Sequence, residues 1–95
     1  MAMSIAATSI DAEILTRVIA PDEPTLSPEA AKSLLSLSFR DQDRTRMSEL
    51  AERARKGTLT AEEQVEIEGF ERISSLLGLL QSKARVSLKK TNARP

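Results

Sequence analysis

Five oxygen-bearing side chains follow one another at the spacing of a calcium-binding loop. Counted from the first, they stand at positions one, three, five, nine and twelve: Asp41, Asp43, Thr45, Glu49 and Glu52. Such a loop requires glycine at its sixth position for a sharp turn, and Arg46 stands there instead. The same side chains suit a helix start and pairs of opposite charge four residues apart. We therefore predict that the spacing is accidental and that no metal is bound.

The side chains that most often perform acid–base or nucleophilic chemistry are scarce. The 95 residues include no histidine and no cysteine, which excludes imidazole and thiol catalysis, disulfides and zinc-finger sites. Serines are present, but no base is placed in the sequence to activate one. The sequence therefore predicts a protein that is not an enzyme and that needs no cofactor.

Charge is balanced over the whole chain but is uneven along it. Lys and Arg total 14, as do Asp and Glu, whereas a dedicated nucleic-acid binder is usually basic. Residues 83–95 nevertheless carry several basic side chains and no acidic one. Such an end either complements the dipole of a helix or contacts nucleic acid, and both interpretations stay open. The candidate nucleic-acid contacts are Lys83, Arg85, Lys89 and Lys90.

The first half of the chain predicts helices joined by an extended connector. Residues 1–9 are small and polar and are expected to be frayed. Residues 10–19 are rich in apolar side chains, whose spacing of four favours a short helix over a strand. Two prolines between residues 20 and 25 then force an extended connection. Ser27 is a suitable N-cap for a helix that is expected to run to about Leu37.

The second half predicts two antiparallel helices. One begins near Asp41 and ends at Gly57, which suits a left-handed C-cap. Thr60 and Glu63 have the spacing of a capping box that opens a long helix, from residue 61 to beyond residue 84. Because the connection is short, the two helices must be antiparallel neighbours. The predicted fold class is all-α: a helical hairpin with a long C-terminal helix, a shorter preceding helix and an N-terminal apolar arm.

The long helix carries leucine or isoleucine on nearly every side between Ile73 and Leu80. These side chains either fill an intramolecular core or form an interface with another chain. A domain of this size without disulfides or metals is marginally stable alone, which favours the interface. The predicted partner-binding face adds apolar residues of the N-terminal arm and comprises Ile14, Leu15, Val18, Ile19, Leu76, Leu79 and Leu80.

These patterns predict three segments and a cytoplasmic location. Residues 1–26 are an arm and connector, residues 27–88 the helical domain, and residues 89–95 a basic tail. No leader is recognisable, and no apolar run approaches the about 20 residues of a membrane span.

Three stretches of the chain are distinctive: "LSPEAAKSLLSLSF", "MSELAERARKGTLTAEEQVEIEGFERI" and "LLGLLQSKARVSL". They resemble a family of small uncharacterised bacterial proteins that is common in cyanobacteria and planctomycetes. The resemblance covers roughly residues 14–88 and includes the family's "GTLTPEE" turn, with Ala61 in place of the proline, and its "LLQSKAR" ending. Members are often encoded beside an HNH-type nuclease, which implies a partner or antitoxin of that nuclease but assigns no functional residues.

The expected function is therefore a non-catalytic protein–protein interaction module. It would bind a second copy of itself or a neighbouring-gene product. The alternative is a small nucleic-acid-binding regulator that uses the basic C-terminal end.

Overall fold

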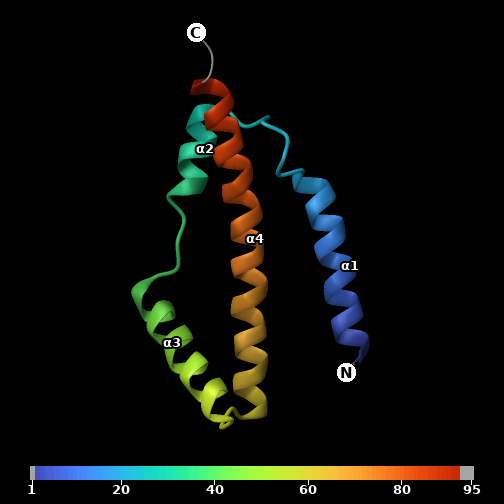
Figure 1. Ribbon diagram of the computed structural model, residues 1–95, viewed down its shortest axis with the longest axis vertical. Helices are drawn as coiled ribbons and strands as arrows, with labels where there is room; N and C mark the ends of the chain where they lie inside the picture. Colours follow the sequence, from blue (N-terminus) through green and yellow to red (C-terminus); the bar gives the residue numbers. More distant parts are fainter. Residues whose placement is uncertain (1, 93–95) are drawn as a thin grey trace. The chain divides into compact units, whose positions relative to one another are not determined.

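The computed structural model describes the backbone of residues 2–92 and the side chains of residues 10–90. This part of the chain contains four helices and no strand (Figure 1). They are α1 (Ala2–Ile19), α2 (Pro28–Leu35), α3 (Asp41–Lys56) and α4 (Ala61–Asn92). The prediction of an all-α fold with a long C-terminal helix is thus confirmed. None of the described helices has the length and apolar character needed to cross a membrane.

The described chain divides into two compact units. One contains residues 2–36 and 78–92, and the other contains residues 37–77. The unit of residues 37–77 is the helical hairpin of α3 and the first half of α4. The unit of residues 2–36 and 78–92 contains α1, α2 and the second half of α4.

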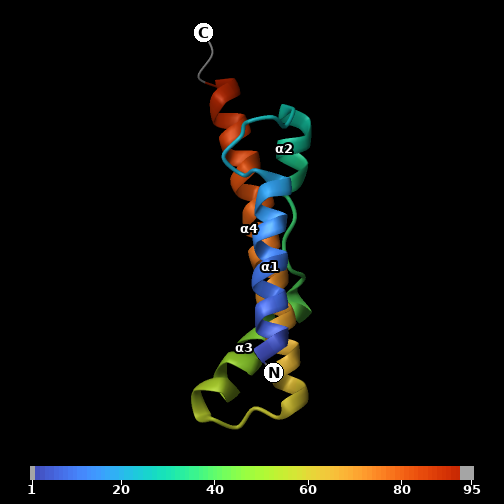
Figure 2. The ribbon, with the colours of Figure 1, turned by 90° about the vertical axis from the view of Figure 1, so that its right-hand side faces the viewer.

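The hairpin turn follows the local signals of the sequence (Figure 2). Gly57 ends α3 in the left-handed conformation, with φ of 70° and ψ of 27°. The main-chain N–H of Thr60 then donates to Oε1 of Glu63 at 3.0 Å, and the N–H of Glu63 donates to Oγ1 of Thr60 at 3.1 Å. This reciprocal capping box satisfies two N–H groups that a helix start leaves without partners. The predicted turn is confirmed at both ends.

Apolar contacts hold the two helices of the hairpin together. Leu50 of α3 is fully buried, while Met47 and Ile67 are partly buried. Phe39 precedes α3 and packs edge to face on Phe70 of α4, with ring centroids 5.9 Å apart and planes inclined by 67°. Edge-to-face packing is the favoured geometry for an aromatic pair. The two phenylalanines of the chain therefore close the open end of the hairpin.

Helix α2 packs beside the C-terminal part of α4 (Figures 1 and 2). It begins as expected, because Oγ of Ser27 accepts a hydrogen bond from the N–H of Ala30 at 3.1 Å. It ends at Leu35, two residues before the predicted end, and Ser36 forms its C-cap. Ala31 and Ala84 are both fully buried in this unit. Small side chains at these positions permit close approach of neighbouring backbones.

Helix α1 is longer than the sequence indicated. It begins at Ala2, so the expectation that residues 1–9 are frayed is wrong for residues 2–9, and the strand alternative is wrong as well. The helix ends at Ile19, after which Ala20 adopts a positive φ of 48°. The N–H of Ala20 donates to the carbonyl oxygen of Thr16 at 2.8 Å. A left-handed residue followed by Pro21 terminates the helix.

Candidate functional site

Helix α1 exposes three apolar side chains on one face. Ile10, Ile14 and Val18 are 55%, 46% and 75% exposed, and we call these three residues the α1 stripe. Side chains four residues apart lie one above the other along a helix, so the three form a continuous ridge. Leu15 and Ile19, the other apolar residues predicted for this arm, are half-buried.

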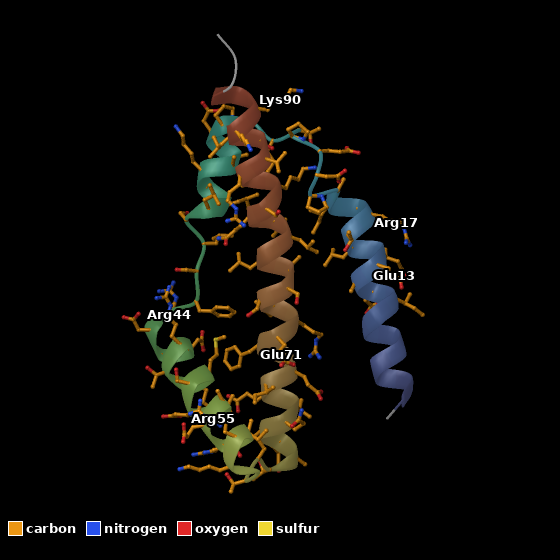
Figure 3. All side chains as sticks on the ribbon, in the orientation of Figure 1. Glu13, Arg17, Arg44, Arg55, Glu71 and Lys90 are labelled. Carbon is orange, nitrogen blue, oxygen red and sulfur yellow. The ribbon has the colours of Figure 1, made fainter. Side chains whose placement is uncertain are left out.

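Charged side chains border the α1 stripe. Asp11, Glu13 and Arg17 are all exposed, and Figure 3 labels Glu13 and Arg17 one turn apart on α1. Among the residues that the structure describes, none of these three forms an ion pair. The stripe is thus an apolar ridge with exposed charges beside it, and none of these charges is ion-paired within the described residues.

The leucines of α4 are placed differently from the expectation. Leu76, Leu79 and Leu80 are each half-buried, and none is among the strongly exposed apolar side chains. On α4 those are Val65, which is 64% exposed, and Ile73, which is 52% exposed. The arm half of the predicted partner-binding face therefore contributes more open apolar surface than the leucine half does.

Three polar side chains of α4 form hydrogen bonds with the backbone of residues 19–34. The sequence alone did not predict these contacts. Nζ of Lys83 donates to the carbonyl oxygens of Ile19 at 2.7 Å and of Ala20 at 3.2 Å. These are carbonyls that the end of α1 leaves without helical partners. A cation there also complements the negative end of the helix dipole.

The other two polar contacts hold the connector and α2. Nε2 of Gln81 donates to the carbonyl oxygen of Leu34 at 3.1 Å, at the C-terminal end of α2. Oγ of Ser87, which is only 2% exposed, accepts a hydrogen bond from the N–H of Leu26 at 3.2 Å. In the sequence, these polar residues are visible only as interruptions of the apolar run in "LLQSKARVSL". Such an interruption does not indicate which backbone groups they contact.

The basic candidates for nucleic-acid contact separate into two groups. Lys83 is partly buried and engaged with the end of α1, whereas Arg85, Lys89 and Lys90 are exposed. Figure 3 labels Lys90 near the end of α4. The structure therefore leaves three of the four predicted basic residues on an open surface.

A network of ion pairs ties α3 to α4 within the hairpin. Arg46 donates from Nε and Nη2 to the two carboxylate oxygens of Glu66, at 2.8 and 2.9 Å. Nη1 of Arg46 lies 3.2 Å from Oε1 of Glu49, and Nη2 lies 3.6 Å from Oε2 of Glu63. The hydrogen bonds from Arg46 lower the pKa of Glu66, and the same bonds raise the pKa of Arg46. This bidentate arrangement is typical of a structural arginine–carboxylate pair.

A spacing of four residues predicts two ion pairs within α3, Glu49 with Arg53 and Glu52 with Lys56. A pair across the hairpin replaces the first of them. Lys56 pairs with Glu52 at 3.7 Å, as its spacing of four indicated. Arg53 instead forms its ion pair with Glu63 of α4. Glu49 and Glu52, two members of the calcium-like spacing, are thus ion-paired on a continuous helix. Within the described part of the chain, no group of three or more acidic, histidine or cysteine side chains is arranged to hold a metal ion.

An open groove lies between the two helices of the hairpin. Its volume is about 630 Å³, and most of its lining is apolar. The lining residues are Met47, Leu50, Ala51, Ala54, Ile67, Phe70, Glu71, Ser74 and Ser75. Glu71 supplies the charged group of this lining and is exposed (Figure 3). A carboxylate and two serine hydroxyls without a basic partner do not form an acid–base pair.

Comparisons of the chain with family models, with curated proteins and with solved structures find no match. The candidate site therefore rests on the geometry of this chain.

Proposed function

We propose that this protein is a small, non-catalytic helical module that binds another protein through the α1 stripe. The observation that carries the proposal is the exposure of Ile10, Ile14 and Val18 along one ridge of α1. Full burial of an isoleucine or valine side chain contributes about 1.5–3 kcal/mol. The stripe therefore offers stabilisation that packing within the chain does not use, and a contact with another chain can supply it.

The way in which α1 is held also supports a binding role. Lys83 holds the carbonyl oxygen of Ile19, the last residue of α1, and Val18 of the α1 stripe directly precedes Ile19. An apolar ridge on a helix with a fixed end loses less conformational freedom on binding than the same ridge on an unfolded segment. The two partner classes that we propose are a second copy of the chain and a neighbouring-gene nuclease, the latter from the family resemblance.

The test is a protein that carries two charges in the stripe, Ile14→Glu with Val18→Glu. The matched control is Ala12→Glu, which adds a carboxylate to the opposite, exposed face of α1. Proteins that co-purify at 0.1 and 1 M NaCl are identified by mass spectrometry, and binding is measured again with pure components. We expect wild type and control to bind in both salts and the stripe variant to lose binding.

Two results would count against this function. One is a wild-type chain that stays monomeric at high micromolar concentration and binds no identified protein through the stripe. The other is DNA or RNA binding that weakens steeply with salt and disappears on replacing Arg85, Lys89 and Lys90 by glutamine, because phosphate contacts release counterions. The second result would establish the nucleic-acid alternative.

A further inference from the structure

The α1 stripe has the symmetry that contact with a second copy requires. Ile14 lies at its centre, and Ile10 and Val18 lie four residues to either side. Consider two α1 helices that cross antiparallel with a two-fold axis at Ile14. Each residue before Ile14 in one copy then meets the residue that lies equally far after Ile14 in the other copy. The partner's Val18 then packs against Ile10, and the two Ile14 side chains meet. Ridges made of residues four apart are those that interlock in the commonest class of helix packing.

Charges at the edges of the stripe distinguish between the two possible directions of pairing. At about 100° per residue, Glu13 and Arg17 lie on the same side of Ile14, about 100° and 60° away from it. Asp11 lies about 60° away on the opposite side. All three side chains are exposed, and none of them is ion-paired in the described structure. The stripe thus has one edge with both signs of charge and one edge with a carboxylate.

Antiparallel pairing brings like edges together. Arg17 then lies about two residues along the axis from the partner's Glu13, and the same contact occurs twice by symmetry. Side chains on a helix tilt toward its N-terminus, and in antiparallel helices these tilts bring the guanidinium and the carboxylate closer. Each copy's Arg17 is therefore placed to pair with the partner's Glu13.

Parallel pairing brings unlike edges together and has the opposite consequence. The edge with Glu13 would face the edge with the partner's Asp11, only about two residues away along the axis. Two carboxylates at this separation repel each other and disfavour the parallel arrangement.

We infer that α1 pairs antiparallel with α1 of a second copy, with Ile14 on the two-fold axis. This inference rests on the proposed function and names its partner. The α1 stripe spans only about two helical turns, well below the about 800 Å² per partner of a standard interface. The association is therefore expected to be weak, with half of the protein dimeric only at about 100 µM or above.

Disulfide trapping tests the direction of pairing, because the natural chain contains no cysteine. Ile10→Cys and Val18→Cys proteins are oxidised separately and as a mixture at several hundred micromolar. Antiparallel pairing predicts a disulfide between Cys at 10 and Cys at 18 in the mixture and little linkage of Val18→Cys to itself. In that arrangement the two copies of position 18 are about 12 Å apart along the axis, beyond disulfide reach. Self-linked Val18→Cys dimers in preference to mixed ones would overturn the antiparallel assignment.

Charge exchange provides a second measurement with its own control for folding. Glu13→Arg and Arg17→Glu proteins should each be at least several-fold weaker in self-association than wild type. Mixed together they should form heterodimers, since one chain is positive and the other negative along this edge. Circular dichroism of each protein alone controls for loss of helix, and sedimentation equilibrium measures the association.

Failure of the self-pairing can be distinguished from failure of the protein-binding function. A wild-type protein that is monomeric at several hundred micromolar, with no trapped dimer, overturns the self-pairing. If an identified protein still binds through Ile14 and Val18 in that case, the interaction function stands with a different partner. If no protein binds through Ile14 and Val18, the self-pairing and the protein-binding function are both wrong.

Discussion

Nζ of Lys83 lies 2.7 Å from the carbonyl oxygen of Ile19 and donates a hydrogen bond to it. This contact joins α4 to the last residue of α1 across 64 positions of sequence. It satisfies a carbonyl that the helix end leaves without a partner and places positive charge at the negative end of the helix dipole. The side chain that looked like a free cation in the sequence therefore caps a helix.

Replacing Lys83 by Met should remove this cap while keeping the aliphatic stem. A hydrogen bond that involves a charged group typically contributes about 1.5–3 kcal/mol, and this one is partly exposed, so we expect a loss of about 1–2 kcal/mol in the free energy of unfolding. Hydrogen exchange should become faster mainly at residues 14–20, at and just after the end of α1. Lys89→Met, on the exposed surface of the same helix, should leave both measurements unchanged. Equal effects of the two substitutions would contradict the capping role.

Gly57 and Gly78 should respond oppositely to alanine. No atom lies within 4 Å of a Cβ built on either residue, so steric contact does not separate them. Gly57 has a φ of 70°, and a left-handed conformation costs an L-residue about 1–2 kcal/mol, so Gly57→Ala should lower the thermal midpoint. Gly78 lies inside α4, where alanine stabilises by about 0.5–1 kcal/mol relative to glycine. Thermal unfolding of the two variants tests this, and a shift of the same sign in both would refute the turn geometry.

The capping box predicts a difference between alanine and serine at position 60. Thr60→Ala removes the oxygen that accepts from the N–H of Glu63 and should destabilise the protein by about 1 kcal/mol. Thr60→Ser keeps that oxygen and should retain most of the wild-type stability. Urea unfolding monitored by circular dichroism measures both. A serine variant as unstable as the alanine variant would show that the methyl group of Thr60, rather than its hydroxyl, matters.

The pair of Arg46 and Glu66 predicts a dependence of stability on pH. Hydrogen bonds from Arg46 hold the pKa of Glu66 below its ordinary value, so the folded state favours the ionised carboxylate. Its contribution to stability is fully present above the unfolded-state pKa of about 4.3 and is lost as pH falls through the lower, folded-state pKa. Glu66→Gln should therefore be less stable than wild type at pH 7, and this difference should shrink as pH falls below about 4. Thermal midpoints of both proteins between pH 7 and 3 provide the measurement, and a constant difference would be contrary to the pairing.

The sequence by itself determined the features that depend on neighbours within one helical turn. Ser27, Gly57 and the Thr60–Glu63 box start or stop helices where their residue types indicated. These elements are predictable because their hydrogen bonds join residues three or four positions apart, which every copy of the same short sequence can form. The length of α1 was underestimated because its first residues lack an apolar pattern.

Only the tertiary structure decided which distant groups meet. Arg53 has one carboxylate four residues before it and another across the hairpin, and the packing of α3 on α4 selects Glu63. Lys83 had no local sign that it caps α1, since its partner oxygens lie 63 and 64 positions away. Burial is also decided by the tertiary structure. Leu79 is half-buried and Val18 is exposed, although both are apolar residues on helices. Exposure depends on where other helices lie, and no pattern within one helix contains that information.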